Sequence, residues 1–505
     1  MRNIVARKKL SSIQIIVFIL IFLCGTFLRF VDFDDPPLDF HPARQLHSAL
    51  IARSYFLKDN GNLPGKSADY QHEAEMRGSQ EPRIEPPIME RLAAWGYKIV
   101  GDADLRVPRA MSIVFWLIGG IGLFRLCRRF LGITGSLVGF GFFLLFPYTI
   151  FASRSFQPDP LMVALMIWSL NALVEWDSHP AIGSAILTGV LTGTAILVKQ
   201  VCVFPLASAF AFYIFSSSDR KQKIKRVDFW IIVALSVAPV LIYNYWGYFV
   251  KGFLVQQYQG RFSLSDWFSP AFYVRWIRKM DEVFGIVVVT AGLVGCLACE
   301  NRRARLLWIG FFAGYILYGL ALPHHIGTHD YYQLPLFPLI SFGIGRSAES
   351  IFEVVGRLKE GRTLAYVGIT VCLILLGAWW SADSVISLNR RDYRAWPERW
   401  QSLAAELDPY PGQINTIGIM DDYGAAMIYW GLRTPVIWEQ NIEKLSEEEA
   451  DTIIRQAMIN REYLIVTDLD SFYAQPRLQN WLVRNTKLYA EEPEYLIYDL
   501  RGLNE

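Results

Sequence analysis

Charged side chains interrupt the apolar runs of this chain at only a few positions. These side chains are candidates for binding or catalysis. Arg154 and Asp159 flank Pro158 in the segment SRSFQPDP, and Lys199 stands between two apolar runs. Because charge is costly beside lipid, such residues usually mark a substrate or ion site. Arg154 suits a forked contact to phosphate, with Asp159 orienting it or binding a metal. The simpler alternatives are an Arg154–Asp159 pair and a Lys199 that extends to the membrane surface.

A second group of polar residues lies in the hydrophilic segment 31–106. Asp39 opens an amphipathic run that would lie flat on a surface. Its carboxylate could act there as a general base or only as a helix N-cap, and both interpretations stay open. His41 suits a structural histidine slightly better than a proton carrier.

The segment 323–335, PHHIGTHDYYQLP, combines three histidines with Tyr331 and Tyr332. The histidine count suggests zinc, but the spacings are adjacent and i,i+4 in a glycine-containing loop, and no carboxylate pattern completes a ligand set. The two tyrosines could equally be aromatic residues of a membrane interface.

Membrane helices are the elements that must position these residues. The chain has 505 residues, with 49 Lys and Arg against 47 Asp and Glu, a net charge of +2. Hydrophobic residues make up 53% and charged residues 19%, which excludes a disordered chain and an ordinary cytosolic enzyme. The small net charge removes the electrostatic argument for nucleic acid. All six cysteines lie in apolar runs and are interpreted as buried apolar side chains.

Eleven apolar stretches are long enough to cross about 30 Å of hydrocarbon. The first follows four basic residues without a small-residue cleavage site, so we expect an uncleaved signal anchor. The predicted spans are 12–30, 109–127, 132–151, 159–175, 181–198, 200–217, 229–250, 283–299, 306–322, 331–345 and 364–382.

The loop charges orient these spans. With a cytoplasmic N-terminus, the inner segments carry 19 Lys and Arg and the short outer segments carry 7. Positive charge accumulates on the cytoplasmic side, so this orientation is predicted. It places segment 31–106, the turn around Pro158, Lys199 and segment 323–335 at the same outer face.

The composition changes after the last span. Residues 385–505 alternate strand-like runs at 414–420, 434–439, 463–468 and 495–500 with helical runs, one of which follows a capping-box pattern. The predicted fold class is therefore an α-helical polytopic membrane protein of about eleven transmembrane helices with a C-terminal soluble α/β domain. We expect a transmembrane catalytic domain at 1–384, which includes the outer loop 31–106, and an extracytoplasmic domain at 385–505.

Several sequence motifs follow one another in a specific order along the chain. A surface helix and a second, PP-containing surface helix are followed by RVPRAMSIVFWLIGGIGLFRLCRRFLG, FPYTIFASRSFQPDPLMVALMIWSLNALVEW, GTAILVKQVCVFP and HDYYQLPLFPL. Over residues 12–345 this resembles the C-type (GT-C) membrane glycosyltransferase superfamily. The resemblance is in particular to the bacterial relatives of protein O-mannosyltransferase and of the lipid A aminoarabinose transferase (PMT-like and ArnT-like). Each motif is weak alone, whereas their order and spacing are specific.

The resemblance implies a sugar donor carried on polyprenyl phosphate. An acceptor hydroxyl would lose its proton to Asp39 and attack the anomeric carbon with inversion. Arg154 and Lys199 would bind the phosphate, because cations stabilise a leaving group that gains charge. His329, Tyr331 and Tyr332 would add hydrogen-bond donors.

One departure affects the base. Relatives place an acidic pair before the first surface helix, where this chain has Ala43, Arg44 and Gln45. Asp39 lies slightly upstream of that pattern, so Glu85 and Asp159 remain alternative bases.

The remaining roles follow from the same pattern. His41 and Arg44 are candidates for orienting the acceptor. No cofactor is required and no metal is assigned, with Asp159 and Glu85 as the ligands if a divalent metal binds.

The resulting hypothesis is a multi-pass enzyme of the bacterial inner (plasma) membrane with its site on the outer face. Its partners would be the polyprenyl-phosphate sugar, membrane lipid, and an envelope glycan, lipid or protein acceptor, without nucleic acid. The alternatives are a non-catalytic scaffold on the same fold, and a transporter or flippase of lipid-linked sugars. A transporter usually has broken helices with midplane charges and two similar halves, which are not evident here.

Overall fold

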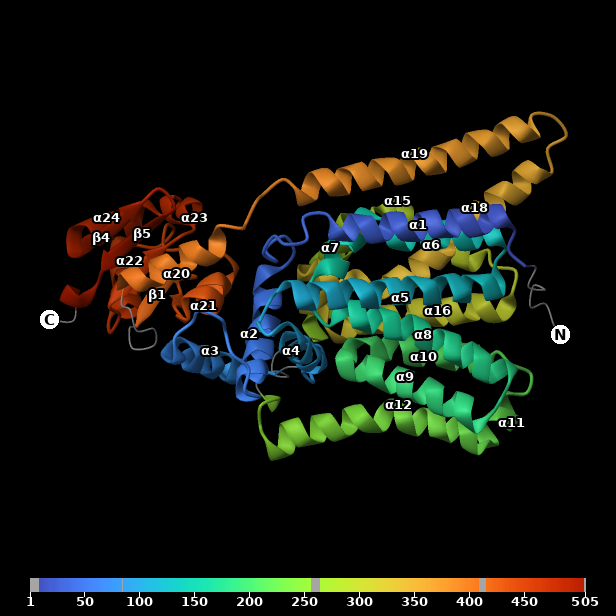
Figure 1. The fold of residues 1–505 in the computed structure, drawn as a ribbon, viewed down its shortest axis with the longest axis horizontal. Coiled ribbons are helices and arrows are strands. Elements are labelled where there is room, and N and C mark those ends of the chain that lie inside the picture. Colours follow the sequence, from blue (N-terminus) through green and yellow to red (C-terminus); the bar gives the residue numbers. More distant parts are fainter. Residues whose placement is uncertain (1–8, 84, 256–263, 408–414, 504–505) are drawn as a thin grey trace. The chain divides into compact units, whose positions relative to one another are not determined.

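The computed structural model describes residues 9–83, 85–255, 264–407 and 415–503 (Figure 1). Most of these residues are helical. The α-helices of the first half are α1 (Ser12–Phe30), α2 (Pro42–Lys58), α3 (Ala68–Gln80), α4 (Ile88–Val100), α5 (Arg106–Phe130), α6 (Ile133–Leu145), α7 (Pro147–Arg154), α8 (Asp159–Ser178), α9 (Ile182–Val198), α10 (Val203–Phe215), α11 (Arg220–Lys225) and α12 (Val227–Tyr245). Those of the second half are α14 (Pro270–Phe284), α15 (Ile286–Leu297), α16 (Arg302–Ala321), α17 (Pro323–Thr328), α18 (Phe337–Gly356), α19 (Arg362–Leu388), α20 (Trp396–Leu407), α21 (Ala425–Gly431), α22 (Glu447–Met458), α23 (Leu469–Tyr473) and α24 (Pro476–Asn485).

Short helical turns and five strands complete the structure. The turns are η1 (Gln200–Cys202), η2 (Trp246–Val250), η3 (Leu264–Phe268), η4 (Asp330–Leu336), η5 (Asp421–Gly424) and η6 (Arg501–Leu503). The strands are β1 (Thr416–Ile419), β2 (Val436–Ile437), β3 (Tyr463–Val466), β4 (Lys487–Glu492) and β5 (Tyr495–Asp499).

The contacts divide the chain into two compact units. The first unit contains Met1–Phe33, Pro82–Met89 and Pro108–Arg391, and the second contains Asp34–Glu81, Glu90–Val107 and Asp392–Glu505. Most of the hydrophilic segment 31–106 thus packs with the C-terminal residues, whereas the sequence grouped it with the membrane helices. The reason is direct packing, since α2 lies against α21 and the Tyr70 hydroxyl donates to the Trp430 carbonyl (3.3 Å).

The first unit is a bundle of apolar helices, and the chain is a membrane protein. In the described residues, six helices are long and apolar enough to cross a membrane, and a seventh and eighth are added if each bent pair is one span. The six are α1, α5, α8, α12 with η2, α16 and α19. The bent pairs are α6 with α7 (57°) and α14 with α15 (89°).

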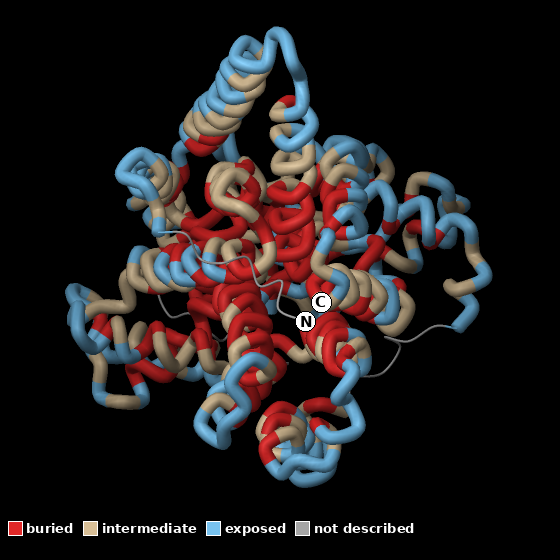
Figure 2. Tube along the Cα trace, turned by 90° about the vertical axis from the view of Figure 1, so that its right-hand side faces the viewer, coloured by how far each residue is buried: buried red, intermediate tan, exposed pale blue. Residues whose placement is uncertain are grey.

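Every one of the eleven predicted spans overlaps a helix, but their lengths differ. α9 and the segment formed by η1 and α10 are shorter apolar helices, and α18 follows directly after η4. The count of eleven crossings therefore stays a prediction. Figure 2 shows long buried stretches along the inner helices, whereas α19 buries only Ser384 and Leu388.

Glycines let helices of this bundle approach closely. A Cβ at Gly193 of α9 would lie 2.2 Å from the Leu235 carbonyl oxygen of α12. A Cβ at Gly343 of α18 would lie 1.8 Å from the Gly292 carbonyl oxygen of α15. Since no side chain can occupy these positions, the two helix pairs depend on glycine there.

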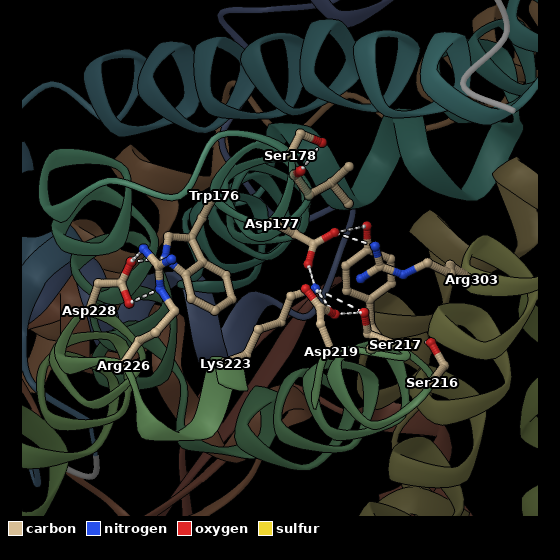
Figure 3. A network of polar contacts seen from close by, with 12 residues as sticks. Trp176, Asp177, Ser178, Ser216, Ser217, Asp219, Lys223, Arg226, Asp228 and Arg303 are labelled. Atoms are coloured by element: carbon tan, nitrogen blue, oxygen red, sulfur yellow. Dashed lines mark hydrogen bonds and ion pairs between the residues drawn. The ribbon is translucent and has the colours of Figure 1, made fainter. Parts of the chain in front are cut away.

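A charged network joins the C-terminal end of α8 to neighbouring helix ends (Figure 3). Asp177 accepts from both Lys223 and Arg303, and Lys223 also donates to the Ser217 hydroxyl (2.9 Å). Beside it, Asp228 accepts from Arg226 (2.7 Å) and from the Trp176 indole (3.1 Å). These bonds tie α8 to α11, α12 and α16. Their residues are polar and paired, so they stabilise the bundle without an obvious reactive group.

The second unit holds a five-stranded sheet of order β2-β1-β3-β5-β4. β1 is parallel to β2 and to β3, while β5 is antiparallel to β3 and to β4. The four predicted strand-like runs contain β1, β2, β3 and β5, and the capping box of Ser446 and Glu449 starts α22. β4 was not predicted, because its residues are mostly exposed and polar, as suits an edge strand.

Two of the six cysteines differ from the expectation of burial. Cys127, Cys202, Cys296 and Cys299 are buried, whereas Cys24 is half-buried and Cys372 is exposed. Cys372 lies on α19, whose sides are largely uncovered by protein, so an apolar run there does not imply burial.

Candidate functional site

A buried ion pair lies where two spans of the first unit begin and end. α9 ends at Val198, and the extended backbone of Lys199 (φ −156°, ψ 112°) separates it from η1. α8 begins at Asp159, directly after Pro158. The Lys199 ammonium donates to both carboxylate oxygens of Asp159, at 2.7 and 2.8 Å. Both side chains are almost fully buried, so each charge depends on the other.

Two tyrosine rings face the same ammonium. Lys199 Nζ lies 4.9 Å from the ring centroid of Tyr331 and 5.1 Å from that of Tyr332. Both distances are within the range of a cation–π contact. The His329 ring lies 5.4 Å from Tyr331 and 5.8 Å from Tyr332. The structure thus brings together Lys199, Asp159, His329, Tyr331 and Tyr332, which the sequence placed in three separate segments.

Arg154 lies at the end of α7, in the turn that leads to Asp159. Its Nη2 donates to the Asp32 carbonyl (2.7 Å), and its side chain is 2% exposed. The Arg109 guanidinium donates to the neighbouring Phe33 carbonyl (2.7 Å). These bonds fasten the end of the 31–33 segment to the helix ends that carry Arg154.

A hydrogen-bond chain holds η4, which carries the two tyrosines. The Trp276 indole donates to the Tyr315 hydroxyl (2.7 Å), and this hydroxyl donates to the Gln333 side chain. Gln333 donates in turn to the Ile326 carbonyl (3.1 Å). These positioning residues were not predicted, although Gln333, an isolated glutamine directly before the apolar run LPLFP, was a usable signal.

Two further buried polar groups were missed. Both side-chain amide atoms of Gln157, between Arg154 and Asp159, are buried without a hydrogen-bond partner in the described part of the chain. The same holds for the hydroxyl of Tyr318, whose ring stacks on Tyr332 at 6.1 Å. Buried polar groups usually have partners, so these groups suit contact with a ligand.

The candidates near the start of α2 belong to the second unit. The N-cap of α2 is His41 in a left-handed conformation (φ 48°), and Pro42 is the first helical residue. Asp39, whose carboxylate is half-buried, therefore does not occupy the N-cap position of α2. Arg44 lies in the first turn of α2.

Glu85 belongs to the first unit and is half-buried in the segment before Pro86. This segment is bonded to α12, because the Tyr243 hydroxyl donates to the Arg83 carbonyl (3.4 Å).

Asp34, the first residue of the second unit, forms an ion pair with Arg394. The Arg394 guanidinium hydrogen-bonds Asp34 (2.9 Å) and holds the pKa of that carboxyl below its usual value. Asp34 is thus ionised and paired at neutral pH.

The histidines do not assemble a ligand set. His324 and His325 lie 5.6 Å apart and His325 and His329 lie 6.2 Å apart, between ring centroids. Within residues 9–83, 85–255, 264–407 and 415–503, no group of three or more His, Cys, Asp or Glu side chains is arranged to hold a metal ion.

The architecture matches solved membrane glycosyltransferases. ArnT from Cupriavidus metallidurans bound to undecaprenyl phosphate superposes with a TM-score of 0.60 at 12% identity, covering 98% of this chain and 100% of that one. The chain has the GT-C fold.

Two further solved glycosyltransferases have a similar fold. Archaeal oligosaccharyltransferase AglB from Archaeoglobus fulgidus, in complex with an inhibitory peptide and a dolichol-phosphate, gives a TM-score of 0.58 at 11% identity, covering 96% of this chain and 74% of that one. Arabinofuranosyltransferase AftD from Mycobacteria gives 0.54 at 15% identity, covering 98% of this chain and 40% of that one.

A family model matches part of the sequence. The family model described as dolichyl-phosphate-mannose-protein mannosyltransferase matches residues 84–246, which include Arg154, Asp159 and Lys199. A search of curated protein sequences finds no match.

Proposed function

We propose that this protein is a glycosyltransferase that moves a sugar from a polyprenyl-phosphate donor to an acceptor hydroxyl, with inversion. The observation that carries the proposal is the buried Lys199 ammonium, held by Asp159 and two tyrosine rings in a chain with the GT-C fold. The similar ArnT structure contains undecaprenyl phosphate and the AglB structure contains a dolichol-phosphate, which supports a lipid phosphate donor.

The Lys199 site suits a phosphate leaving group. An ammonium group has three N–H donors, and two of them reach Asp159. The third can bond a phosphate oxygen while Asp159 fixes the position of the nitrogen. Arg154 adds a second cation, and Gln157 with Tyr318 adds polar groups that lack partners in the described chain. A preorganised cation stabilises the charge that develops on the leaving phosphate.

Asp39 is the proposed base. Its carboxylate would accept the proton of the acceptor hydroxyl as the oxygen forms a bond to the anomeric carbon. The bond from that carbon to the phosphate oxygen breaks, and the phosphate leaves with the electron pair. Asp159 is a weaker candidate for this role, because both of its oxygens already accept from Lys199. Glu85 remains the alternative.

We place the reaction at the outer face of the bacterial inner membrane, with the N-terminus in the cytoplasm. The distribution of basic residues between the loops supports this placement. The acceptor would be an envelope glycan, lipid or protein. If activity requires a divalent metal, Asp159 or Glu85 would bind it.

The deciding experiment measures polyprenyl phosphate released by the purified protein from a panel of polyprenyl-phosphate sugars, with envelope extract as acceptor. We expect Lys199→Ala and Asp39→Asn each to lower turnover by about 100-fold or more, as for the loss of one charged catalytic group. Lys251→Ala is the matched control, since Lys251 is an exposed lysine 5.9 Å from the Trp246 ring. Repeating the assay with a chelator tests the metal.

The other results have definite meanings. Full turnover in Asp39→Asn would move the base to Glu85. Donor binding without release from any sugar would overturn the enzyme proposal in favour of a scaffold, and donor movement across vesicles without release would favour a flippase.

A further inference from the structure

Arg53 is a buried cation with no acidic partner among the described residues. It lies in the middle of α2, its side chain is 4% exposed, and its Nε and Nη2 atoms have no hydrogen-bond partner in the described part of the chain. Its guanidinium carbon lies 4.1 Å from the ring centroid of Tyr429 on α21. A buried unpaired charge is expensive, so its retention needs a reason.

Two other buried arginines donate to backbone carbonyls. Arg29 donates to the Gly25 and Leu144 carbonyls (2.6 and 2.8 Å), and Arg433 donates to the Ala404 carbonyl (2.9 Å). The half-exposed Arg91 also lies over a tyrosine ring, that of Tyr55 at 3.9 Å, and it has a carboxylate partner in Asp59 (2.9 Å). Arg53 lies over a tyrosine ring in the same way but has no carboxylate partner among the described residues.

A second polar group accompanies Arg53. The Tyr97 hydroxyl of α4 is fully buried and has no partner among the described residues. Burial raises the pKa of Tyr97 well above its usual value and that of Tyr429 to about 12, so both phenols stay neutral and can donate. Arg53, Tyr97 and Tyr429 come from three helices of the second unit.

The acidic residues that act on the two tyrosines do not pair with Arg53 in the described structure. Asp102 and Asp104 act electrostatically on Tyr97 and Tyr429. However, Asp104 pairs with Arg106 (2.6 Å), and Asp102 accepts from the Ala103 backbone (2.7 Å). Neither carboxylate forms an ion pair with Arg53 in the described structure.

We propose that Arg53 and Tyr97 form a binding site for an oxyanion, a carboxylate or phosphate, carried by the acceptor. A guanidinium presents paired donors that match both anions, and the Tyr97 hydroxyl supplies a further donor. The assignment of the anion to the acceptor rests on the proposed function, because α2 directly follows Asp39, the proposed base. The acceptor would thus be an acidic glycan, lipid or peptide held by the second unit.

The test measures thermal unfolding of the purified full-length protein in detergent while an acidic sugar is added. The probes are glucuronate and glucose 1-phosphate, with glucose as the neutral control. We expect one or both acidic sugars to raise the Tm in a saturable way, with the more effective one identifying the anion, and glucose to have no effect. Arg53→Met should weaken the apparent affinity at least tenfold, and Tyr97→Phe should weaken it severalfold.

The matched control is Arg91→Met, which removes an arginine over a tyrosine ring but should retain the response. Without added anion, Arg53→Met should unfold no earlier than the wild type, because methionine removes an uncompensated buried charge. The proposal is overturned if neither acidic sugar shifts the Tm, or if Arg53→Met responds like the wild type. Tyr97→Phe tests the same site should Arg53→Met fail to fold.

This measurement contains no polyprenyl donor. If the wild-type protein binds the acidic sugar but does not turn over any donor, only the glycosyltransferase proposal is refuted. Intact turnover without binding of the acidic sugar would refute the Arg53 site alone.

Discussion

The Lys199–Asp159 pair concentrates the charge of the candidate site in two side chains that are almost fully buried. Neither charge would be stable there without the other, since desolvation penalises both. The pair therefore has two separable roles, in stability and in phosphate binding, and substitutions can distinguish them.

Asp159→Asn should destabilise the protein by about 3–5 kcal/mol, because it leaves the Lys199 ammonium buried without its carboxylate. The double variant Lys199→Met with Asp159→Leu should recover most of that stability, since no charge remains, and should stay inactive. Thermal unfolding and release of polyprenyl phosphate, measured on the same preparations, check both statements. A double variant as unstable as the single one would show that the pair contributes more than mutual neutralisation.

The ion pairs of Asp59 should make the stability of the second unit depend on pH. Lys98 (3.1 Å) and Arg91 (2.9 Å) pair with it, and the hydrogen bond from Lys98 is the main reason that its pKa lies below the usual 3.8. The stability from these pairs is present above pH 3.8 and is lost as the pH falls through the lowered pKa. Asp59→Asn should cost up to about 1 kcal/mol at pH 7 and less with increasing acidity. Unfolding midpoints across pH test this, and a constant difference would contradict it.

Among the helices, α9 determines the position of Lys199, because Lys199 directly follows its last residue. α9 packs against α12, and Gly193 allows this approach because a Cβ there would meet the Leu235 carbonyl at 2.2 Å. Near the start of the same helix, a Cβ at Gly183 would meet nothing within 4 Å. The two glycines thus form a matched pair for substitution.

Gly193→Ala should lower stability by about 1–3 kcal/mol, since a backbone carbonyl cannot move aside as a flexible side chain can. It should also lower turnover, because any shift of α9 displaces Lys199. Gly183→Ala should not destabilise, since alanine favours a helix by about 1 kcal/mol over glycine. Unfolding midpoints and donor turnover are the measurements. Equal effects of the two substitutions would argue against close packing as the cause.

The whole molecule combines membrane helices with a second unit that contains both the outer-loop helices and the sheet. The proposed orientation puts that second unit, with Asp39 and Arg53, outside the cytoplasm. The charged network of Asp177, Lys223 and Arg303 would then lie on the cytoplasmic side (Figure 3).

Cysteine labelling tests this orientation. With exposed Cys372 replaced by serine, Glu491→Cys should react with a membrane-impermeant maleimide in intact bacterial cells whose outer membrane is permeabilised. Lys221→Cys should react only after the inner membrane is opened, because it lies in a basic loop between two spans. Protein gels of labelled cells give the result, and the reverse labelling pattern would invert the topology.

Local patterns predicted much of the fold. The apolar runs corresponded to helices throughout the bundle, and alternating runs located four of the five strands. The exposed strand β4 was missed because its sequence, KLYAEE, lacks a buried face. Five candidate residues meet at the Lys199 site. Asp159 and Lys199 were named from the cost of charge beside lipid, and His329, Tyr331 and Tyr332 from the resemblance. The contact between Lys199 and Asp159 was not predicted.

The sequence by itself determined which segments are apolar helices, which are strands, and which charges are out of place near lipid, because these depend on composition and on neighbouring residues. Only the tertiary structure decided that Lys199 pairs with Asp159, that segment 31–106 packs mostly with the C-terminal residues, and that Arg53 is buried beside Tyr429 without a carboxylate. These features join residues far apart in the chain. They follow from how the helices pack, and no local pattern encodes that packing.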